Sequence, residues 1–321
     1  MLASIKALGT ISRAEFLLPN LGSLIMGLAW GATASTSIGE LAVLIALSFA
    51  IINLSSAIGA QANTLSDREL DAKDERKTQL VEAMNSFGER RLKTVLAIEF
   101  TLTLILVSTF MYVQQRIILL LLWILGISLG GAYSLPPARL KSRSWLAPVS
   151  LILVLAFFPV LFAYYSFTDE LNPFFLMSLT GLALTVYGVI VPTEIRDYFG
   201  DKSISIETFT VHIGLVKASM LAILLLSAGA MLTAVAFLLQ FAYGQRLFLG
   251  SLVAAIPIAA FTVLKQFRKL HILAREYAST KDESVKNQIV SVSSQNPRWI
   301  MIITQTYSII SVVMLASKFL L

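Results

Sequence analysis

The sequence predicts an all-α, polytopic membrane protein with about nine transmembrane helices around a central cavity. Of the 321 residues, 56% are hydrophobic and only 14% are charged, whereas about a quarter of the residues are charged in an ordinary soluble domain. Apolar stretches of the roughly 20 residues needed to cross a bilayer core recur from the beginning of the chain to its end. The membrane is therefore expected to surround most of the fold.

The apolar stretches place the helices in chain order. They lie at about 16–34, 38–60, 92–113, 117–133, 147–165, 173–192, 213–241, 247–264 and 299–321. We interpret the chain as a single domain, 1–321, with two pseudo-repeat halves at about 14–145 and 146–265 and a ninth helix at about 299–321. An odd number of helices places the two termini on opposite sides of the membrane.

The basic residues support this helix count. Only Arg116, Arg246 and Lys318 fall in the outer segments, which leaves 22 of the 25 Lys and Arg residues on the inner side. Cytoplasmic loops carry such an excess of positive charge, and a miscounted helix would have mixed the two groups. We therefore expect the N-terminus and the charged loops on the cytoplasmic side of the cell membrane. Short basic loops beside apolar helices do not support nucleic-acid binding.

The composition also limits the chemistry of any site. The chain has no cysteine, and its only histidines are His212 and His271. Disulfides, thiolate nucleophiles, zinc–thiolate sites and histidine-rich metal sites are thereby excluded. A bound metal ion would have to take oxygen ligands, as magnesium does.

Two acidic clusters are predicted at the inner ends of the second and sixth helices. The first reads Asn63-Thr-Leu-Ser-Asp67-Arg-Glu-Leu-Asp71 and the second reads Glu194-Ile-Arg-Asp197-Tyr-Phe-Gly-Asp201. Steps of three and four residues return to one helix face, so each cluster forms a stripe of oxygen ligands. Like charges stacked in this way destabilise a helix unless a cation compensates them, and Mg²⁺ commonly bridges carboxylates to substrate phosphates. The alternative is that these acids only alternate with Arg and Lys in solvated loops.

These residues resemble the UbiA superfamily of intramembrane prenyltransferases. Asn63, Asp67 and Asp71 match the family's N-x-x-x-D-x-x-x-D motif, and its second acidic motif is matched at Asp197 and Asp201, with Glu194 in the first place. Two further segments are similar to family motifs: Tyr133-Ser-Leu-Pro-Pro-Ala-Arg139-Leu-Lys141, and the stretch from Gly200 to Gly214, which has Ile206 near an expected glycine and Phe209 for leucine. Lys77-Thr78 keeps the start of a basic element of the family, but the following Arg-Pro is missing.

The resemblance implies that the chain moves a prenyl group from a prenyl diphosphate to an aromatic or lipid acceptor, with Mg²⁺ as cofactor. Asp67, Asp71, Asp197 and Asp201 are then the catalytic metal ligands, with Asn63 and Glu194 contributing to the metal sites. Candidate diphosphate-binding residues are Asn63, Lys77, Tyr133, Arg139, Lys141 and Lys202. Neutralising the charge of the diphosphate as its bond to carbon breaks is the main chemical requirement.

The alternative functions are a cation-coupled secondary transporter and a membrane phosphatase. A cation-coupled secondary transporter would bind its ions near the membrane midplane, whereas these acids lie at helix ends. A membrane phosphatase would need a positioned nucleophile, for which no His or Ser constellation is evident. Asn20 is expected to bond to another helix, Glu99 stays open between a site and a helix contact, and residues 265–297 are predicted to form a solvated helical hairpin without a catalytic role.

Overall fold

The computed structural model describes residues 2–33, 36–72, 77–203, 206–240 and 246–320, which are helices joined by turns and short connections. The elements are α1 (Leu2–Ile11), η1 (Ala14–Phe16), α2 (Leu17–Gly31), α3 (Ile38–Asp71), α4 (Thr78–Phe87), α5 (Glu89–Gln114), α6 (Ile117–Ser134), η3 (Leu140–Ser142), α7 (Leu146–Ile152), η4 (Leu153–Phe157), α8 (Phe158–Tyr165), α9 (Pro173–Ser203), α10 (Phe209–Ile213), α11 (Leu215–Gln240), α12 (Arg246–Val253), α13 (Ala255–Thr280), α14 (Glu283–Ser293) and α15 (Asn296–Leu320).

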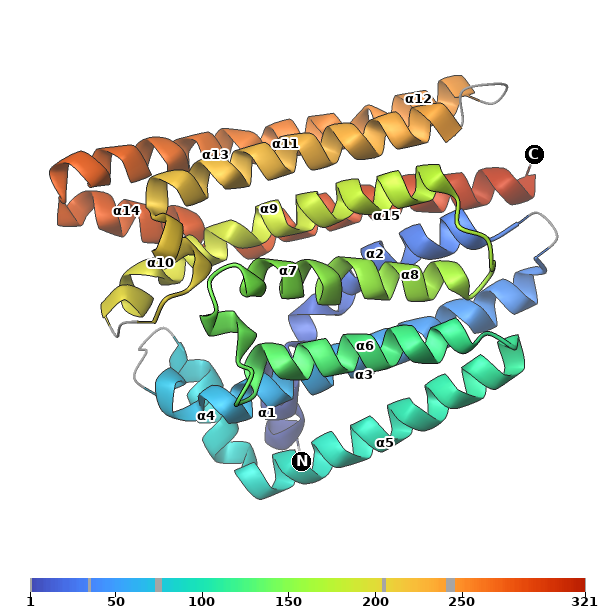
Figure 1. Cartoon of the computed structure of the whole chain (residues 1–321), viewed down its shortest axis with the longest axis horizontal. Helices are drawn as coiled ribbons and strands as arrows, with labels where there is room; N and C mark the ends of the chain where they lie inside the picture. The colour runs from blue at the N-terminus through green and yellow to red at the C-terminus, as the bar shows by residue number, and fades with distance from the viewer. Residues whose placement is uncertain (1, 34–35, 73–76, 204–205, 241–245, 321) are drawn as a thin grey trace.

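The long helices run side by side along the length of the molecule (Figure 1). Within the described residues, eight helical stretches are long and apolar enough to cross a membrane. The predicted helix that is missing from these eight is the first, at about 16–34, which corresponds to α2, whose 15 residues are fewer than a full span needs. The all-helical, multi-pass architecture is confirmed, and the count of nine holds approximately.

The helices bury unequal shares of their apolar surface. In the apolar window of α9, 67% of the residues are buried inside the protein, against 17% in α5. The remaining apolar side chains of α5 face outward, as expected for a helix in contact with lipid. The α9 helix is therefore a central element and α5 a peripheral one, which agrees with their places in Figure 1.

The contact between α9 and α11 depends on small residues. A Cβ atom added to Gly229 of α11 would lie 2.5 Å from the carbonyl oxygen of Gly181 on α9. Thr233 Oγ1 also comes within 3.4 Å of the carbonyl oxygen of Ser178. Small residues are favoured where membrane helices approach closely, because association there depends on packing. This crossing fixes α9 against its neighbour.

Several helices continue past the ends of their apolar stretches. The α3 helix reaches Asp71 and α9 reaches Ser203, although hydropathy alone ends them near 60 and 192. Both acidic clusters are therefore carried on helices, as the sequence predicts. The α13 helix likewise continues to Thr280 and turns back through α14, so the predicted hairpin is present.

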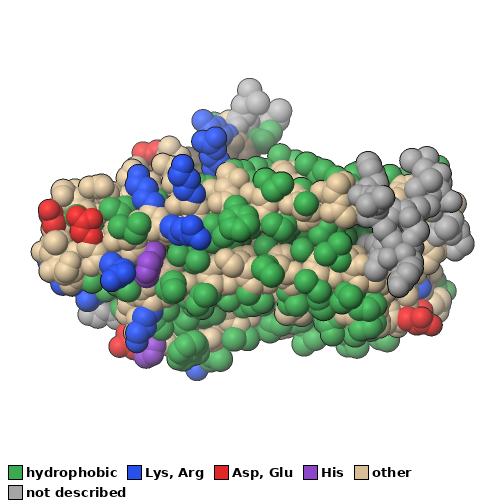
Figure 2. Space-filling view, turned by 90° about the horizontal axis from the view of Figure 1, so that it is seen from above, with side chains coloured by type: hydrophobic (Ala, Val, Ile, Leu, Met, Phe, Trp, Pro, Cys, Tyr) green, Lys and Arg blue, Asp and Glu red, His purple; other side chains and the backbone are tan. Residues whose placement is uncertain are grey.

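Three of the shorter helices and many charged side chains lie at one end of the bundle. The α4, α10 and α14 helices lie at the same end in Figure 1, and the C-terminus lies at the other. On the face shown in Figure 2, most Lys and Arg side chains collect toward that end, and hydrophobic side chains cover the middle. The α1 helix, which the sequence analysis did not predict, packs here through Ala7 and Ile11 against Leu80 and Met84.

Candidate active site

A cavity of about 1590 Å³ opens among the ends of α3, α6, α7 and α9. Its polar end contains nearly all the residues that the motifs single out: Asn63, Asp67, Asp71, Lys77, Tyr133, Arg139, Lys141, Glu194, Asp197 and Asp201. Its other end is apolar and includes Ile51, Leu122, Trp123, Phe158 and Phe162. The cavity thus joins a charged compartment to a long hydrophobic one.

The first acidic cluster lies on the cavity-facing side of α3. Asp67 and Asp71 are only 8% and 4% exposed, although both are ionisable. They line the cavity together with Asn63, as the four-residue spacing predicts. Buried carboxylates are costly unless they are paired, so their partners are informative.

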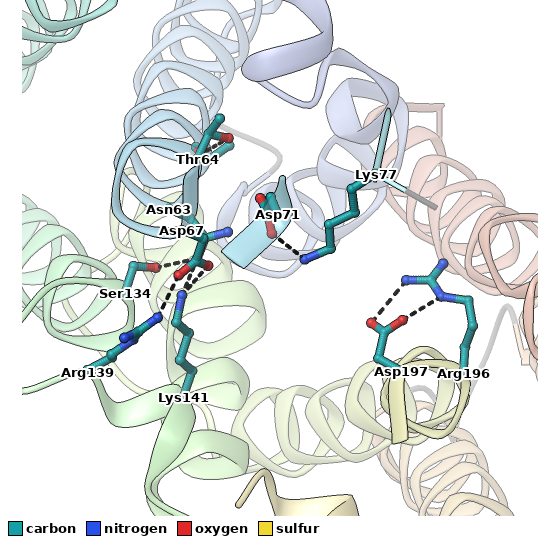
Figure 3. A network of polar contacts seen from close by, with 11 residues as sticks. Asn63, Thr64, Asp67, Asp71, Lys77, Ser134, Arg139, Lys141, Arg196 and Asp197 are labelled. Atoms are coloured by element: carbon teal, nitrogen blue, oxygen red, sulfur yellow. Dashed lines mark hydrogen bonds and ion pairs between the residues drawn. The ribbon is translucent and has the colours of Figure 1, made fainter. Parts of the chain in front are cut away.

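Asp67 accepts hydrogen bonds from two basic side chains (Figure 3). Arg139 Nη2 donates to Oδ1 at 3.0 Å, and Lys141 Nζ donates to Oδ2. The Lys141 ammonium also donates to Asn63 Oδ1 at 3.1 Å, and Ser134 Oγ donates to the same oxygen at 3.0 Å. The first cluster and the Tyr133–Lys141 segment therefore form one polar network.

The backbone of the segment between α6 and α7 places the Arg139 and Lys141 side chains next to Asp67. Arg139 has a φ of 38° and a ψ of 56°, a left-handed conformation that few non-glycine residues adopt. Its Nε–H is buried and makes no hydrogen bond within the described residues. Burial lowers the pKa of the Lys141 ammonium below its usual value, while the hydrogen bond to Asp67 raises it. A strained backbone and an unsatisfied donor at one cavity wall indicate a place for an anionic ligand.

Asp71 has a separate basic partner. Lys77 Nζ donates to its Oδ1 at 2.6 Å (Figure 3). Lys77 immediately precedes α4 and lines the cavity. Lys77, the first residue of the Lys-Thr pair, therefore lies at the cavity, although no Arg-Pro follows the pair.

The second acidic cluster faces the cavity from α9. Asp197 and Asp201 both line it. The Arg196 guanidinium donates from Nε to Asp197 Oδ1 at 3.0 Å and from Nη2 to Oδ2 at 3.2 Å (Figure 3). A two-point contact of this kind fixes the carboxylate orientation. The two clusters thus lie on different helices that border one cavity.

Glu194 is held differently from the aspartates. Its Oε2 accepts a hydrogen bond from Thr210 Oγ1 at 2.7 Å, and its Oε1 accepts one from Tyr187 Oη at 3.3 Å. Thr210 belongs to the short helix α10, which is followed by Gly214. Gly214 has a φ of 81°, a value that favours glycine. The segment from Thr208 to Gly214 therefore holds the Glu194 side chain in place through the hydroxyl group of Thr210.

Of two other predicted site residues, Tyr133 lies at the cavity and Lys202 is not among the described lining residues. Tyr133 lines the cavity at the end of α6. The Lys202 side chain is not among the described lining residues, and its Nζ lies 3.4 Å from Tyr198 Oη and 5.6 Å from the centre of that ring. The structure brings together all the predicted site residues except Lys202.

Asn20 and Glu99 have hydrogen-bond partners on other helices. Asn20 Nδ2 donates to Asn53 Oδ1 on α3 at 3.1 Å, which confirms the expected contact between helices, and Asn20 also lines the cavity. Gln61 Nε2 donates to Glu99 Oε2 at 2.7 Å and to Ser12 Oγ at 3.0 Å. Glu99 thus bonds to a neighbouring helix.

Sequence reasoning missed several lining residues. Arg196 and Ser134 lie inside the quoted motifs, but each is adjacent to a motif residue and points about 100° away from it on an ideal helix, so the spacing does not predict that they line the cavity. Lys286, Asn287 and Val290 of α14 also line the cavity. No local pattern in 265–297 indicates that this segment folds back on the acidic helix end.

The oxygen donors at the cavity are of the types that suit a magnesium ion. Among the described residues, no three His, Asp or Glu side chains are close enough together to hold an ion. The nearest charged partners of Asp67, Asp71 and Asp197 are basic side chains. Carboxylate and amide oxygens on both sides of the cavity are nevertheless the ligand types that Mg²⁺ prefers.

The fold and the motifs agree with known proteins. No curated protein sequence matches the chain. The fold is similar to a UbiA homolog from Archaeoglobus fulgidus bound to GPP and Mg2+, with a TM-score of 0.60 and 17% identity over 92% of this chain and 99% of that one. It is also similar to digeranylgeranylglyceryl phosphate synthase, with a TM-score of 0.64 and 14% identity over 97% and 99% of the two chains. An apo UbiA homolog from Aeropyrum pernix K1 gives a TM-score of 0.58 and 13% identity over 89% and 97%.

The sequence itself identifies the family. The model of the UbiA prenyltransferase family matches residues 20–276, which include both acidic clusters and the segment between α6 and α7. This assignment favours a prenyltransferase over a transporter or a phosphatase. The protein is an integral, multi-pass membrane enzyme, and the chain belongs to the UbiA prenyltransferase family.

Proposed function

We propose that the protein transfers a prenyl group from a prenyl diphosphate to an aromatic or other hydrophobic acceptor, with Mg²⁺ as cofactor. The observation that carries the proposal is the cavity, which joins two facing carboxylate clusters to a long apolar compartment. A diphosphate with an isoprenoid tail has the same two-part chemistry. Similar folds include UbiA homologs bound to GPP and Mg2+ and to DMAPP and Mg2+.

Asp67 and Asp71 on one wall and Asp197 and Asp201 on the other would hold the metal ions. Asn63 would contribute an amide oxygen, and Glu194 would support the second wall. When bound, Mg²⁺ supplies positive charge that stabilises the departing diphosphate. The hydrogen bonds from Thr210 and Tyr187 to Glu194 keep that side chain in place.

The basic residues would exchange partners during binding. Lys77 donates to Asp71, and Arg139 and Lys141 donate to Asp67. With those carboxylates holding Mg²⁺, these side chains would be available for phosphate oxygens, with which Arg and Lys form charge-assisted hydrogen bonds. The unsatisfied Nε–H of Arg139 would gain a partner in the same way.

The reaction would proceed through ionisation of the allylic carbon–oxygen bond. The bonding electron pair leaves with the diphosphate, the acceptor attacks the allylic carbon, and the acceptor then loses a proton. The apolar compartment around Trp123, Phe158 and Phe162 would hold the tail and exclude water from the cation. We place this polar end, together with the N-terminus, on the cytoplasmic side, because most basic residues lie on the inner segments.

The test is direct. The purified protein is incubated with geranyl or geranylgeranyl diphosphate, Mg²⁺ and a panel of hydroxybenzoate, naphthoate, homogentisate and glycerol phosphate lipid acceptors, and products are identified by mass. A prenylated product formed only with Mg²⁺ supports the proposal. Failure to bind either diphosphate, measured separately, would contradict it.

A further inference from the structure

The α14 helix lies outside the family motifs but borders the cavity. Lys286, Asn287 and Val290 are among the lining residues, whereas the family match ends at residue 276. The sequence predicts no catalytic role for this hairpin. Its position at the polar end therefore needs a physical explanation.

The α14 helix is firmly attached to the bundle. Val285, Ile289 and Val292 are buried in the same apolar cluster as Ile195 of α9. At its start, Asp282 Oδ1 accepts a hydrogen bond from the Ser284 backbone N–H at 2.7 Å, which caps the helix. The face of α14 that carries Lys286 is thereby held in a fixed position beside the second acidic cluster.

The Lys286 ammonium interacts only weakly with Glu283 and Phe199, the partners that it contacts. Its Nζ lies 2.6 Å from Glu283 Oε1, but the Glu283 side chain is 69% exposed, so water screens the pair. The same ammonium lies 5.5 Å from the ring centre of Phe199, which is on α9 between Asp197 and Asp201 and also lines the cavity. Such a cation can leave a solvated carboxylate for a stronger anion at little cost.

We propose that Lys286 is a further diphosphate-binding residue, supplied by α14 to the side of the cavity that carries Asp197 and Asp201. The inference rests on the proposed function. The cations that bind Asp67 and Asp71 come from the α6–α7 segment and from the start of α4. Lys286 adds a positive charge from a segment beyond both pseudo-repeat halves, on the side of the cavity where Arg196 also lies, so basic side chains from both sides of the cavity would contact the diphosphate.

The experiment measures the dissociation constant of geranyl diphosphate in the presence of Mg²⁺ for the full-length protein. Lys286→Gln should weaken binding about tenfold, because a charge-assisted hydrogen bond is lost. Lys286→Arg should restore most of the affinity. Lys281→Gln is the matched control, because Lys281 lies in the same hairpin, stacks on Tyr277 and is absent from the described cavity lining.

A second variant separates a direct contact from a structural effect. Glu283→Gln removes the ion pair of Lys286 but keeps the ammonium, so geranyl diphosphate binding should be unchanged or tighter. Equal weakening in Glu283→Gln, or in Lys281→Gln, would overturn the inference, as would wild-type affinity in Lys286→Gln. Wild-type protein that binds no geranyl diphosphate would overturn the proposed function as well, which distinguishes the two failures.

Discussion

Asp67 combines burial with two basic partners, and this combination decides how a substitution acts. Its side chain is 11% exposed and contacts both Arg139 and Lys141. Asp67→Asn keeps the shape but removes the charge that a metal ion would need. We expect turnover to fall by at least about 100-fold, the usual loss when a charge-stabilising group is removed from an active site. Asp201→Asn should have a similar effect, measured as kcat with prenyl diphosphate.

The control is Glu69→Gln, which removes a negative charge from the exposed side of the same helix. Its turnover should match the wild type. Thermal unfolding should show all three variants folded, because none of these side chains fills an apolar core. Unchanged turnover in both aspartate variants would refute the site assignment.

Trp123 offers a test of the apolar compartment. It lines the cavity and donates from Nε1 to Ser55 Oγ at 3.0 Å, so its ring is held in one orientation. Trp123→Phe removes this bond and part of the ring volume. We expect kcat/KM to shift toward longer prenyl diphosphates, by about threefold or more, a change typical of one or two added methylene groups in an apolar pocket. Trp145→Phe is the control, since Trp145 is 63% exposed and is not among the described lining residues; an equal shift there would contradict the prediction.

At the scale of the elements, α3 and α9 show what hydropathy can and cannot predict. Apolar stretches located the membrane-spanning parts of both helices, because burial in lipid requires a continuous apolar sequence. Their polar ends, up to Asp71 and Ser203, were recognised only through the spacing of the carboxylates. The spacing of Val285, Ile289 and Val292 indicates an amphipathic helix, but the local sequence does not specify that α14 packs against α9, nor that α1 packs against α4, because these are contacts between distant segments.

The residues of the site also fall into those that the sequence spacing predicts and those that it does not predict. The spacing of Asn63, Asp67 and Asp71 predicted a shared face, and that face borders the cavity. The resemblance brought in Arg139 and Lys141, whose contacts with Asp67 no spacing rule could supply. Lys202 is next to a motif residue, but adjacent positions on a helix point about 100° apart, so it contacts Tyr198 instead.

The crossing of α9 and α11 gives a prediction about stability. Gly229→Ala would place a methyl group 2.5 Å from the Gly181 carbonyl oxygen. The helices would have to move apart, at a cost of about 1–3 kcal/mol in the free energy of unfolding. Gly39→Ala in α3 is the matched control, because its added Cβ meets nothing within 4 Å. Thermal unfolding in one detergent should show a lower midpoint for Gly229→Ala only, and equal midpoints would disprove the packing argument.

At the scale of the whole molecule, the acidic and basic residues that line the cavity are equal in number within the described part of the chain. Among the described lining residues, the acidic ones are Asp67, Asp71, Glu194, Asp197, Asp201 and Glu207, and the basic ones are Arg13, Lys77, Arg139, Lys141, Arg196 and Lys286. Six of each give these residues a formal net charge of zero. Neither a cation nor an anion alone is therefore expected to be strongly favoured, whereas a metal–diphosphate complex would satisfy both sets of residues.

This balance predicts that Mg²⁺ and prenyl diphosphate bind cooperatively. Each ligand neutralises the residues that the other leaves unpaired, so each should tighten the other by the same factor. The measurement is a titration of geranyl diphosphate with and without Mg²⁺, followed by the reciprocal titration. We expect at least about a fivefold effect, the lower end of typical coupling between sites. Equal affinity in both conditions would show that basic residues alone hold the diphosphate.

The ion pairs at Asp67, Asp71 and Asp197 have a further consequence for an enzyme that works intermittently. When no ligand is bound, Lys77, Arg139, Lys141 and Arg196 can pair with the carboxylates of Asp71, Asp67 and Asp197. The empty site would then need no bound ions to remain folded in a medium of low polarity. Periods without isoprenoid supply should therefore leave the protein intact, and its survival in the membrane should be independent of how often it turns over.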